Sequence, residues 1–122
     1  MKTIVILDDE FSLTDVLATA LSNAGFRVHT GANGALGLEL ISEHVPDLVL
    51  LDYMMPGLDG PSVLRAMRAD ERLARIPVLI MSSLPESIVG GNCTGYATFL
   101  RKPFLFEAVL AAVERAIAPG VS

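Results

Sequence analysis

Charged residues stand just past three short apolar runs of the sequence, and this placement predicts a binding site. Apolar runs of this length, separated by helix-like segments, are typical of buried strands in a parallel sheet. Charged side chains at the carboxyl ends of such strands meet in the crevice where open α/β sheets bind their ligands. The residues are Asp8 and Asp9 after residues 3–7, Asp52 after residues 48–51, and Lys102 after residues 98–100. Three carboxylates and an ammonium group in one crevice indicate a divalent-cation site with phosphate chemistry.

The carboxylates of this predicted site need a cation or a bound proton to lie side by side. If the first and third apolar runs are neighbouring strands, Asp8 and Asp9 lie close to Asp52. Two like charges about 4 Å apart repel by ~4 kcal/mol at an effective dielectric constant of 20, which calls for a cation or a raised pKa. Oxygen ligands suit Mg²⁺, with Mn²⁺ as a second candidate. Such an ion would neutralise phosphoryl oxygens and let a carboxylate attack phosphorus.

Phosphoryl chemistry at Asp52 also needs a fixed cation and a hydroxyl donor for the other phosphoryl oxygens. Lys102 can supply the cation, and Ser82, which ends a fourth apolar run, can supply the hydroxyl. Each residue has an ordinary structural role as well: Ser82 as a turn residue, Lys102 as a solvated loop residue, Asp9 as a helix N-cap. Their joint occurrence at equivalent strand ends favours the site.

The elements that must position these residues alternate between strand and helix. Strands are predicted at Ile4–Leu7, Arg27–Thr30, Leu48–Leu51, Ile76–Met81 and Phe99–Leu100. Helices are predicted at Phe11–Ala24, Ala35–Glu43, Ser62–Asp70 and Leu105–Ala116. Repeated strand–helix units with short connections predict an α/β fold with a doubly wound, five-stranded parallel sheet and helices on both faces.

One segment departs from this alternation. A fourth helix is expected between Ser83 and Thr98, but that stretch contains Pro85, Gly90, Gly91 and Gly95. Each glycine costs a helix interior roughly 1 kcal/mol relative to alanine. We therefore expect one or two turns around Glu86–Val89, followed by irregular chain.

Length and composition limit the alternatives. At 122 residues the chain forms one domain, predicted at residues 1–118 with a short tail at residues 119–122. It lacks the long apolar run of a membrane span and the layout of a signal peptide. The single cysteine, Cys93, excludes an internal disulfide and suits a reducing cytosol, so we expect a cytoplasmic protein. A net charge of −5 argues against direct nucleic-acid binding.

Several other polar or adaptable residues are given ordinary roles. His29 and His44 are expected to lie far apart on separate elements, without the spacing of a metal site. The methionines are expected to fill the core, and the arginines to form a mainly solvated face around the third long helix. These residues are Met54, Met55, Met67 and Met81, and Arg65, Arg68, Arg72 and Arg75.

Four motifs along the chain resemble those of the response-regulator receiver domain, the phosphoacceptor half of two-component signalling. The motifs are Asp8-Asp9-Glu10, Asp52 through Gly60, Pro77 through Ser83, and Lys102-Pro103-Phe104. They run from the first strand to the last helix, so the resemblance covers nearly the whole chain. It implies a flavodoxin-like strand order, 2-1-3-4-5.

The resemblance also implies a role for each matching residue. Asp52 would be phosphorylated by a partner histidine kinase or phosphotransfer protein. Mg²⁺ would be bound by Asp9, Asp52 and the backbone carbonyl of Met54, with Asp8 holding a metal-bound water. Ser82 and Lys102 would bind phosphoryl oxygens, and Phe99 would be the aromatic residue whose rotamer follows the hydroxyl. The peptide bond between Lys102 and Pro103 would be cis, and the Pro56–Gly60 turn would shape the site.

Two positions differ from the usual family pattern. Met54 lies two residues beyond Asp52, and Leu84 lies two residues beyond Ser82. Polar residues at these positions often assist the attacking water in this family. We therefore hypothesise that the aspartyl phosphate of this protein is long-lived.

The predicted function is that of a phosphorylation-controlled switch rather than an enzyme. Its signal would pass through a partner protein, as yet unidentified, or through a phosphorylation-dependent homodimer. The alternatives are an aspartate-nucleophile phosphatase of the haloacid dehalogenase type, a flavin-binding domain, and a receiver fragment of a longer regulator or hybrid kinase. The phosphatase would need an acid where Met54 stands, and the flavin domain a phosphate loop where Asp8-Asp9-Glu10 stands.

Overall fold

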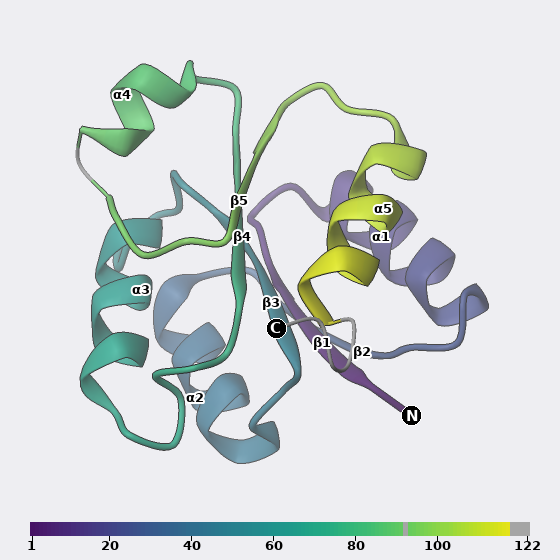
Figure 1. Ribbon diagram of the computed structural model, residues 1–122, viewed down its shortest axis with the longest axis horizontal. Helices are drawn as coiled ribbons and strands as arrows, with labels where there is room; N and C mark the ends of the chain where they lie inside the picture. Colours follow the sequence, from purple (N-terminus) through teal and green to yellow (C-terminus); the bar gives the residue numbers. More distant parts are fainter. Residues whose placement is uncertain (92, 118–122) are drawn as a thin grey trace.

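The computed structural model describes residues 1–91 and 93–117, and in this part of the chain strands and helices alternate (Figure 1). The strands are β1 (Thr3–Leu7), β2 (Arg27–Gly31), β3 (Leu48–Asp52), β4 (Val78–Ser82) and β5 (Thr98–Arg101). The helices are α1 (Phe11–Asn23), α2 (Gly34–His44), α3 (Gly60–Ala69), α4 (Glu86–Gly90) and α5 (Phe106–Ile117). The predicted tail at residues 119–122 and the domain boundary at residue 118 lie outside the described residues.

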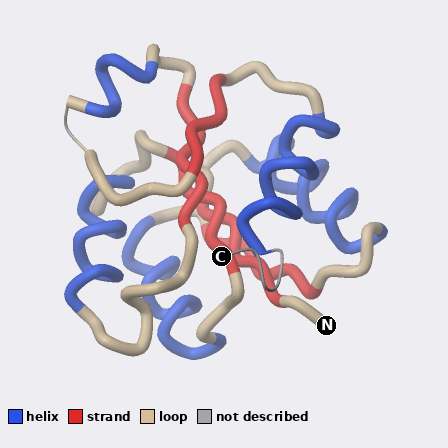
Figure 2. The backbone as a smooth tube through the Cα atoms, in the orientation of Figure 1, coloured by secondary structure: helices blue, strands red, loops and turns tan. Residues whose placement is uncertain are grey.

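The sheet is parallel throughout, with the strand order β2-β1-β3-β4-β5. Helices α1 and α5 cover one face, while α2, α3 and α4 cover the other, so the sheet forms the middle layer (Figures 1 and 2). The predicted fold class and strand order are confirmed.

Alternate residues of the central strands supply two separate cores because strand side chains point to opposite faces. Val5 and Leu7 of β1 join the core beneath α2, α3 and α4. Ile4 and Ile6 join the core beneath α1 and α5. Every residue of β3 and β4 is buried, which explains their continuous apolar sequences.

The predicted short fourth helix is confirmed, since α4 spans only Glu86–Gly90. Helix α3 begins two residues earlier than predicted. Asp59 is its N-cap, and Asp59 Oδ1 accepts a hydrogen bond from Ser62 N at 3.0 Å. A Cβ atom at Gly60 would lie 2.5 Å from the carbonyl oxygen of Asp52, so glycine is needed where α3 starts against the end of β3.

The expected separation of His29 and His44 is wrong. Their rings are stacked, with centroids 3.7 Å apart and an interplanar angle of 12°. Helix α2 runs back along β2, which brings its last turn to the level of His29. Such a contact between a strand and the end of the following helix cannot be seen in the spacing of the two residues.

Two other assignments are corrected by the structure. Met54 is 61% exposed and does not fill the core, whereas Met55, Met67 and Met81 are buried. Arg68 is half-buried and donates hydrogen bonds to three backbone carbonyls, unlike the exposed Arg65, Arg72 and Arg75. In the described residues, no helix has the length and apolar character that crossing a membrane requires.

Candidate functional site

The strand register brings the predicted site residues to one edge of the sheet. Leu7 pairs with Leu51, so Asp8, which follows β1, lies next to Asp52, the last residue of the neighbouring β3. On the other side of β3, Asp52 pairs with Met81, the residue before Ser82. Lys102 follows β5 and its backbone N–H donates to the carbonyl oxygen of Ser82 at 2.7 Å. The parallel arrangement therefore gathers four strand ends at this edge.

The three aspartates form a compact group of hard oxygen donors. Asp8, Asp9 and Asp52 each place one carboxylate oxygen within 4.8 Å of the others. Asp8 and Asp52 are 1% and 6% exposed, while Asp9 is open to solvent. Carboxylate oxygens with room for water are the ligands that Mg²⁺ prefers, so this donor set fits the predicted ion.

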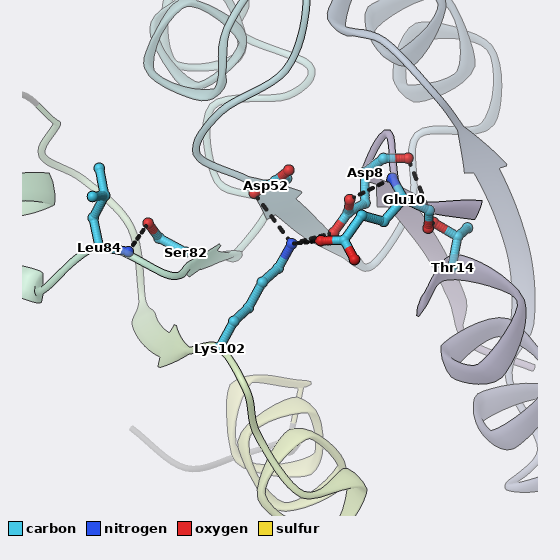
Figure 3. A network of polar contacts seen from close by, with 7 residues as sticks. All are labelled: Asp8, Glu10, Thr14, Asp52, Ser82, Leu84 and Lys102. Atoms are coloured by element: carbon cyan, nitrogen blue, oxygen red, sulfur yellow. Dashed lines mark hydrogen bonds and ion pairs between the residues drawn. The ribbon is translucent and has the colours of Figure 1, made fainter. Parts of the chain in front are cut away.

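Lys102 supplies the positive charge of the site (Figure 3). Its Nζ atom lies 2.8 Å from Asp8 Oδ2, 3.5 Å from Asp52 Oδ1 and 3.3 Å from Glu10 Oε1. Burial alone would lower the pKa of Lys102, but the hydrogen bond to Asp8 and the charges of Asp52, Asp8 and Glu10 raise it. The ammonium group is therefore fixed in its charged form between the acidic side chains.

The Asp52 carboxyl group has a strongly shifted pKa, raised to about 7. Burial is the main cause and the charge of Asp8 is the second; both disfavour the ionised form. Lys102 and the backbone N–H of Met54 act in the opposite direction, and the charge of Asp9 adds to the increase. A divalent cation beside Asp52 would relieve this unfavourable charge.

Ser82 and Phe99 occupy the last two strands. Ser82 is 2% exposed, and its Oγ accepts a hydrogen bond from Leu84 N at 2.9 Å (Figure 3). That contact leaves the hydroxyl proton of Ser82 available to a ligand. Phe99 pairs with Ile80 in the sheet and is half-buried against the core beneath α2, α3 and α4.

A cleft of about 550 Å³ opens above these strand ends. Its lining includes Asp9, Glu10, Asp52, Met54, Ser82 and Lys102. The peptide bond between Lys102 and Pro103 at its border is cis. The cleft is large enough for a phosphoryl group to reach Asp52.

The structure also refines the acidic segment after β1. The N-cap of α1 is Glu10, not Asp9. Sequence reasoning gave Glu10 no separate role, although its place next to Asp8-Asp9 was a signal. It also missed Thr14, whose hydroxyl donates to the Glu10 carbonyl at 3.0 Å (Figure 3). Nothing in the sequence distinguishes Thr14 from an ordinary residue of a helix.

Residues 4–114 match the family model described as the response regulator receiver domain. The chain belongs to this family, whose members are signalling domains of two-component systems and interact with histidine kinases or phosphotransfer proteins.

Among proteins of similar sequence is the DNA-binding dual master transcriptional regulator RpaA of Synechocystis sp. It is 37% identical over 115 residues, which are 93% of this chain and 48% of that protein. The phosphate regulon transcriptional regulatory protein PhoB of Pseudomonas aeruginosa is 34% identical over 99% of this chain and 55% of its own length. This chain thus spans about half the length of these relatives.

Solved structures of similar fold include the chemotaxis protein CheY4 of Vibrio cholerae. Its TM-score is 0.86 at 27% identity, with 95% of this chain and 98% of that chain covered. The receiver domain of sensor histidine kinase PA1611 from Pseudomonas aeruginosa gives a TM-score of 0.88 at 27% identity, with 95% and 97% covered. That structure has a magnesium ion coordinated in its active-site cleft.

Proposed function

We propose that this protein is a phosphorylation-controlled switch that accepts a phosphoryl group on Asp52 from a histidine kinase or a phosphotransfer protein. The observation that carries the proposal is the position of Lys102 Nζ, 3.5 Å from Asp52 at the edge of a three-carboxylate group. An ammonium and a cation site on either side of one buried carboxylate suit the transfer of a dianionic group to that carboxylate.

Asp52 acts as the nucleophile in this proposal. A carboxylate oxygen of Asp52 forms the new bond to phosphorus while the bond between phosphorus and the donor's imidazole nitrogen breaks. Asp8, Asp9, Asp52 and the carbonyl of Met54 would hold Mg²⁺, with Mn²⁺ as a substitute. The ion, when bound, neutralises negative charge on the phosphoryl oxygens. Asp8 would act through a metal-bound water.

The remaining residues of the cleft recognise the product. Lys102 would pair with one phosphoryl oxygen, and the free proton of the Ser82 hydroxyl would be donated to another. Movement of Ser82 would let Phe99 change rotamer and carry the signal toward the surface. Output would follow through a protein partner or a phosphorylation-dependent homodimer.

The central test is incubation with a small phosphodonor and Mg²⁺, followed by measurement of the intact mass. We expect the mass of one phosphoryl group to be added to the wild type and not to Asp52→Asn. A wild type that gains no mass with any donor would contradict phosphoacceptor function.

A phosphatase of the haloacid dehalogenase type is not favoured. Its general acid would occupy the position of Met54, which cannot transfer a proton. We expect no turnover of general phosphate esters. The RpaA and PhoB relatives are transcriptional regulators about twice as long as this chain. The expected lack of direct nucleic-acid binding therefore stays a prediction, and a receiver portion of a longer regulator or hybrid kinase stays an alternative.

A further inference from the structure

Glu10 differs from the other carboxylates that contact Lys102. Its Oε1 lies 3.3 Å from Lys102 Nζ, yet in the described part of the chain Glu10 is outside the three-aspartate group that can hold an ion. Its side chain is 60% exposed, whereas those of Asp8 and Asp52 are 0% and 8% exposed. Glu10 is therefore a carboxylate that pairs with Lys102 but is not needed as a ligand of a bound cation.

The backbone of Glu10 is fixed although its side chain can move. Its N–H donates to Asp8 Oδ1 at 2.9 Å, and its carbonyl accepts hydrogen bonds from Thr14 N and Thr14 Oγ1, both at 3.0 Å. Within residues 1–91 and 93–117, the Glu10 side chain makes no hydrogen bond that caps α1. The carboxylate can thus leave Lys102 without disturbing the start of the helix.

Lys102 must change partners when the proposed reaction takes place. In this structure its ammonium group faces Asp8, Asp52 and Glu10 (Figure 3). A cation bound to the aspartates would weaken the first two contacts, because both carboxylates would then neutralise the ion. Glu10 would remain and compete with the phosphoryl oxygens for the same ammonium group.

We propose that Glu10 is a positioning residue that holds Lys102 in the unphosphorylated state and releases it when a phosphoryl group forms on Asp52. This inference rests on the proposed function. The Glu10 carboxylate also lines the cleft with Asp52 and Ser82, so it repels an anionic donor at the same place. Because exposed ion pairs change an equilibrium by at most about fivefold, the effect on rate is of that order.

The test compares Glu10→Gln with a matched control, Asp15→Asn. Asp15 is an exposed acidic residue of α1, so the control makes the same change in net charge away from Lys102. Each protein is phosphorylated with the doubly charged acetyl phosphate and with the singly charged phosphoramidate in the presence of Mg²⁺. We expect Glu10→Gln to accelerate the reaction with acetyl phosphate roughly three- to fivefold, and with phosphoramidate about twofold or less. Asp15→Asn should leave both rates unchanged.

A spectroscopic measurement tests the change of partner directly. In the wild type, addition of beryllofluoride and Mg²⁺ should move the carboxyl carbon resonance of Glu10 toward that of an unpaired glutamate. In the metal-free protein, Glu10→Gln should shift the ammonium nitrogen resonance of Lys102. A contact that only stabilises the fold would change the free energy of unfolding but not the ratio of rates for the two donors.

Three results would overturn the inference. One is a ratio of the acetyl phosphate rate to the phosphoramidate rate that is the same in the wild type and in Glu10→Gln. Another is a Glu10 carboxyl resonance that does not move when beryllofluoride and Mg²⁺ are added. The third is a loss of Mg²⁺ affinity of about tenfold or more in Glu10→Gln, which would make Glu10 a metal ligand. If neither donor phosphorylates the wild type, the proposed function itself fails and this inference fails with it.

Discussion

At the scale of the single residue, Asp52 links protonation to metal binding. Its pKa of about 7 in the folded protein lies above the ordinary value of 3.8. Between about pH 4 and 7 the folded protein therefore binds more protons than the unfolded chain, so this group makes stability fall as pH rises through that window. A bound cation requires the ionised carboxylate and must displace the proton.

We predict that Mg²⁺ binding releases a proton from Asp52 at pH 6 and almost none at pH 8. Below pH 7, each further drop of one pH unit should lower the affinity for Mg²⁺ by up to about tenfold. Calorimetry in two buffers of different ionisation enthalpy measures the proton release. Asp52→Asn is the control and should release none at either pH. Binding heats that do not depend on the buffer at pH 6 would contradict the assignment.

Met54 and Leu84 bear on the lifetime of the proposed aspartyl phosphate. Both line one hollow of about 700 Å³ beside Asp9, and neither side chain can orient or deprotonate water. We predict slow hydrolysis in the isolated, Mg²⁺-bound protein. The pair of changes Met54→Asn and Leu84→Glu should accelerate hydrolysis roughly tenfold, below the 10²–10⁴ of a well-placed general base.

The loss of phosphoryl mass with time measures this rate. Met54→Leu serves as the matched control because it keeps an apolar side chain, and its rate should equal that of the wild type. A wild type that loses its phosphoryl group as fast as the doubly substituted protein would show that apolar residues here do not protect it.

At the scale of the element, Arg68 connects the end of α3 to the segments that lead into β4 and β5. Arg68 Nη1 donates to the carbonyls of Ala74 and Ile76, both at 3.0 Å, and Arg68 Nη2 donates to that of Gly95 at 2.8 Å. Burial lowers the pKa of this guanidinium, as expected for a charged group that is partly removed from water. One side chain thus joins chain segments up to 27 residues apart.

We predict that Arg68→Met lowers the free energy of unfolding by about 2–3 kcal/mol, because hydrogen bonds to a charged donor are lost and carbonyls are left unsatisfied. Urea unfolding measures the change. Arg72→Met is the control: Arg72 is exposed and pairs with Asp70 at 3.5 Å, so its effect should stay within about 0.5 kcal/mol. Equal effects of the two substitutions would show that the three hydrogen bonds of Arg68 do not stabilise the fold.

His29, which is stacked on His44, gives the contact between α2 and β2 a dependence on pH. Burial lowers the pKa of His29, and the charges of His44 and Arg27 add to this, while Glu43 acts in the opposite direction. Among the described residues, His29 Nε2 is the buried side-chain nitrogen that lacks a hydrogen-bond partner. The folded state therefore favours the neutral ring.

We predict that His29 makes the protein lose stability as pH falls below about 6.5, because its ring then binds a proton more readily in the unfolded chain. The Asp52 effect has the opposite sign in the same window, so the measurement belongs in an Asp52→Asn background. His29→Phe keeps a stacked ring and should flatten the remaining decrease. The same pH dependence before and after that substitution would exclude His29 as its source.

At the scale of the whole molecule, the parts that could be predicted from sequence are those with local signals. Apolar runs located β1, β3, β4 and β5, and the shared carboxyl edge of a parallel sheet brought Asp8, Asp52, Ser82 and Lys102 together. Contacts across the fold had no such signal. The stacking of His29 on His44, the use of Arg68 inside the structure and the exposure of Met54 depend on how helices pack, which no local pattern records.

The order in which the sheet is completed has a consequence for folding during synthesis. Asp8 and Lys102 are 94 residues apart, and β5 is the last of the described strands to leave the ribosome. A nascent chain that ends at β4 already brings the carboxylates that follow β1 close to the carboxylate that ends β3, without the ammonium group that follows β5. Contacts between such distant segments form slowly. The acidic cluster of this domain therefore opposes early closure of its own sheet, and docking of β5 both completes the fold and neutralises the cluster.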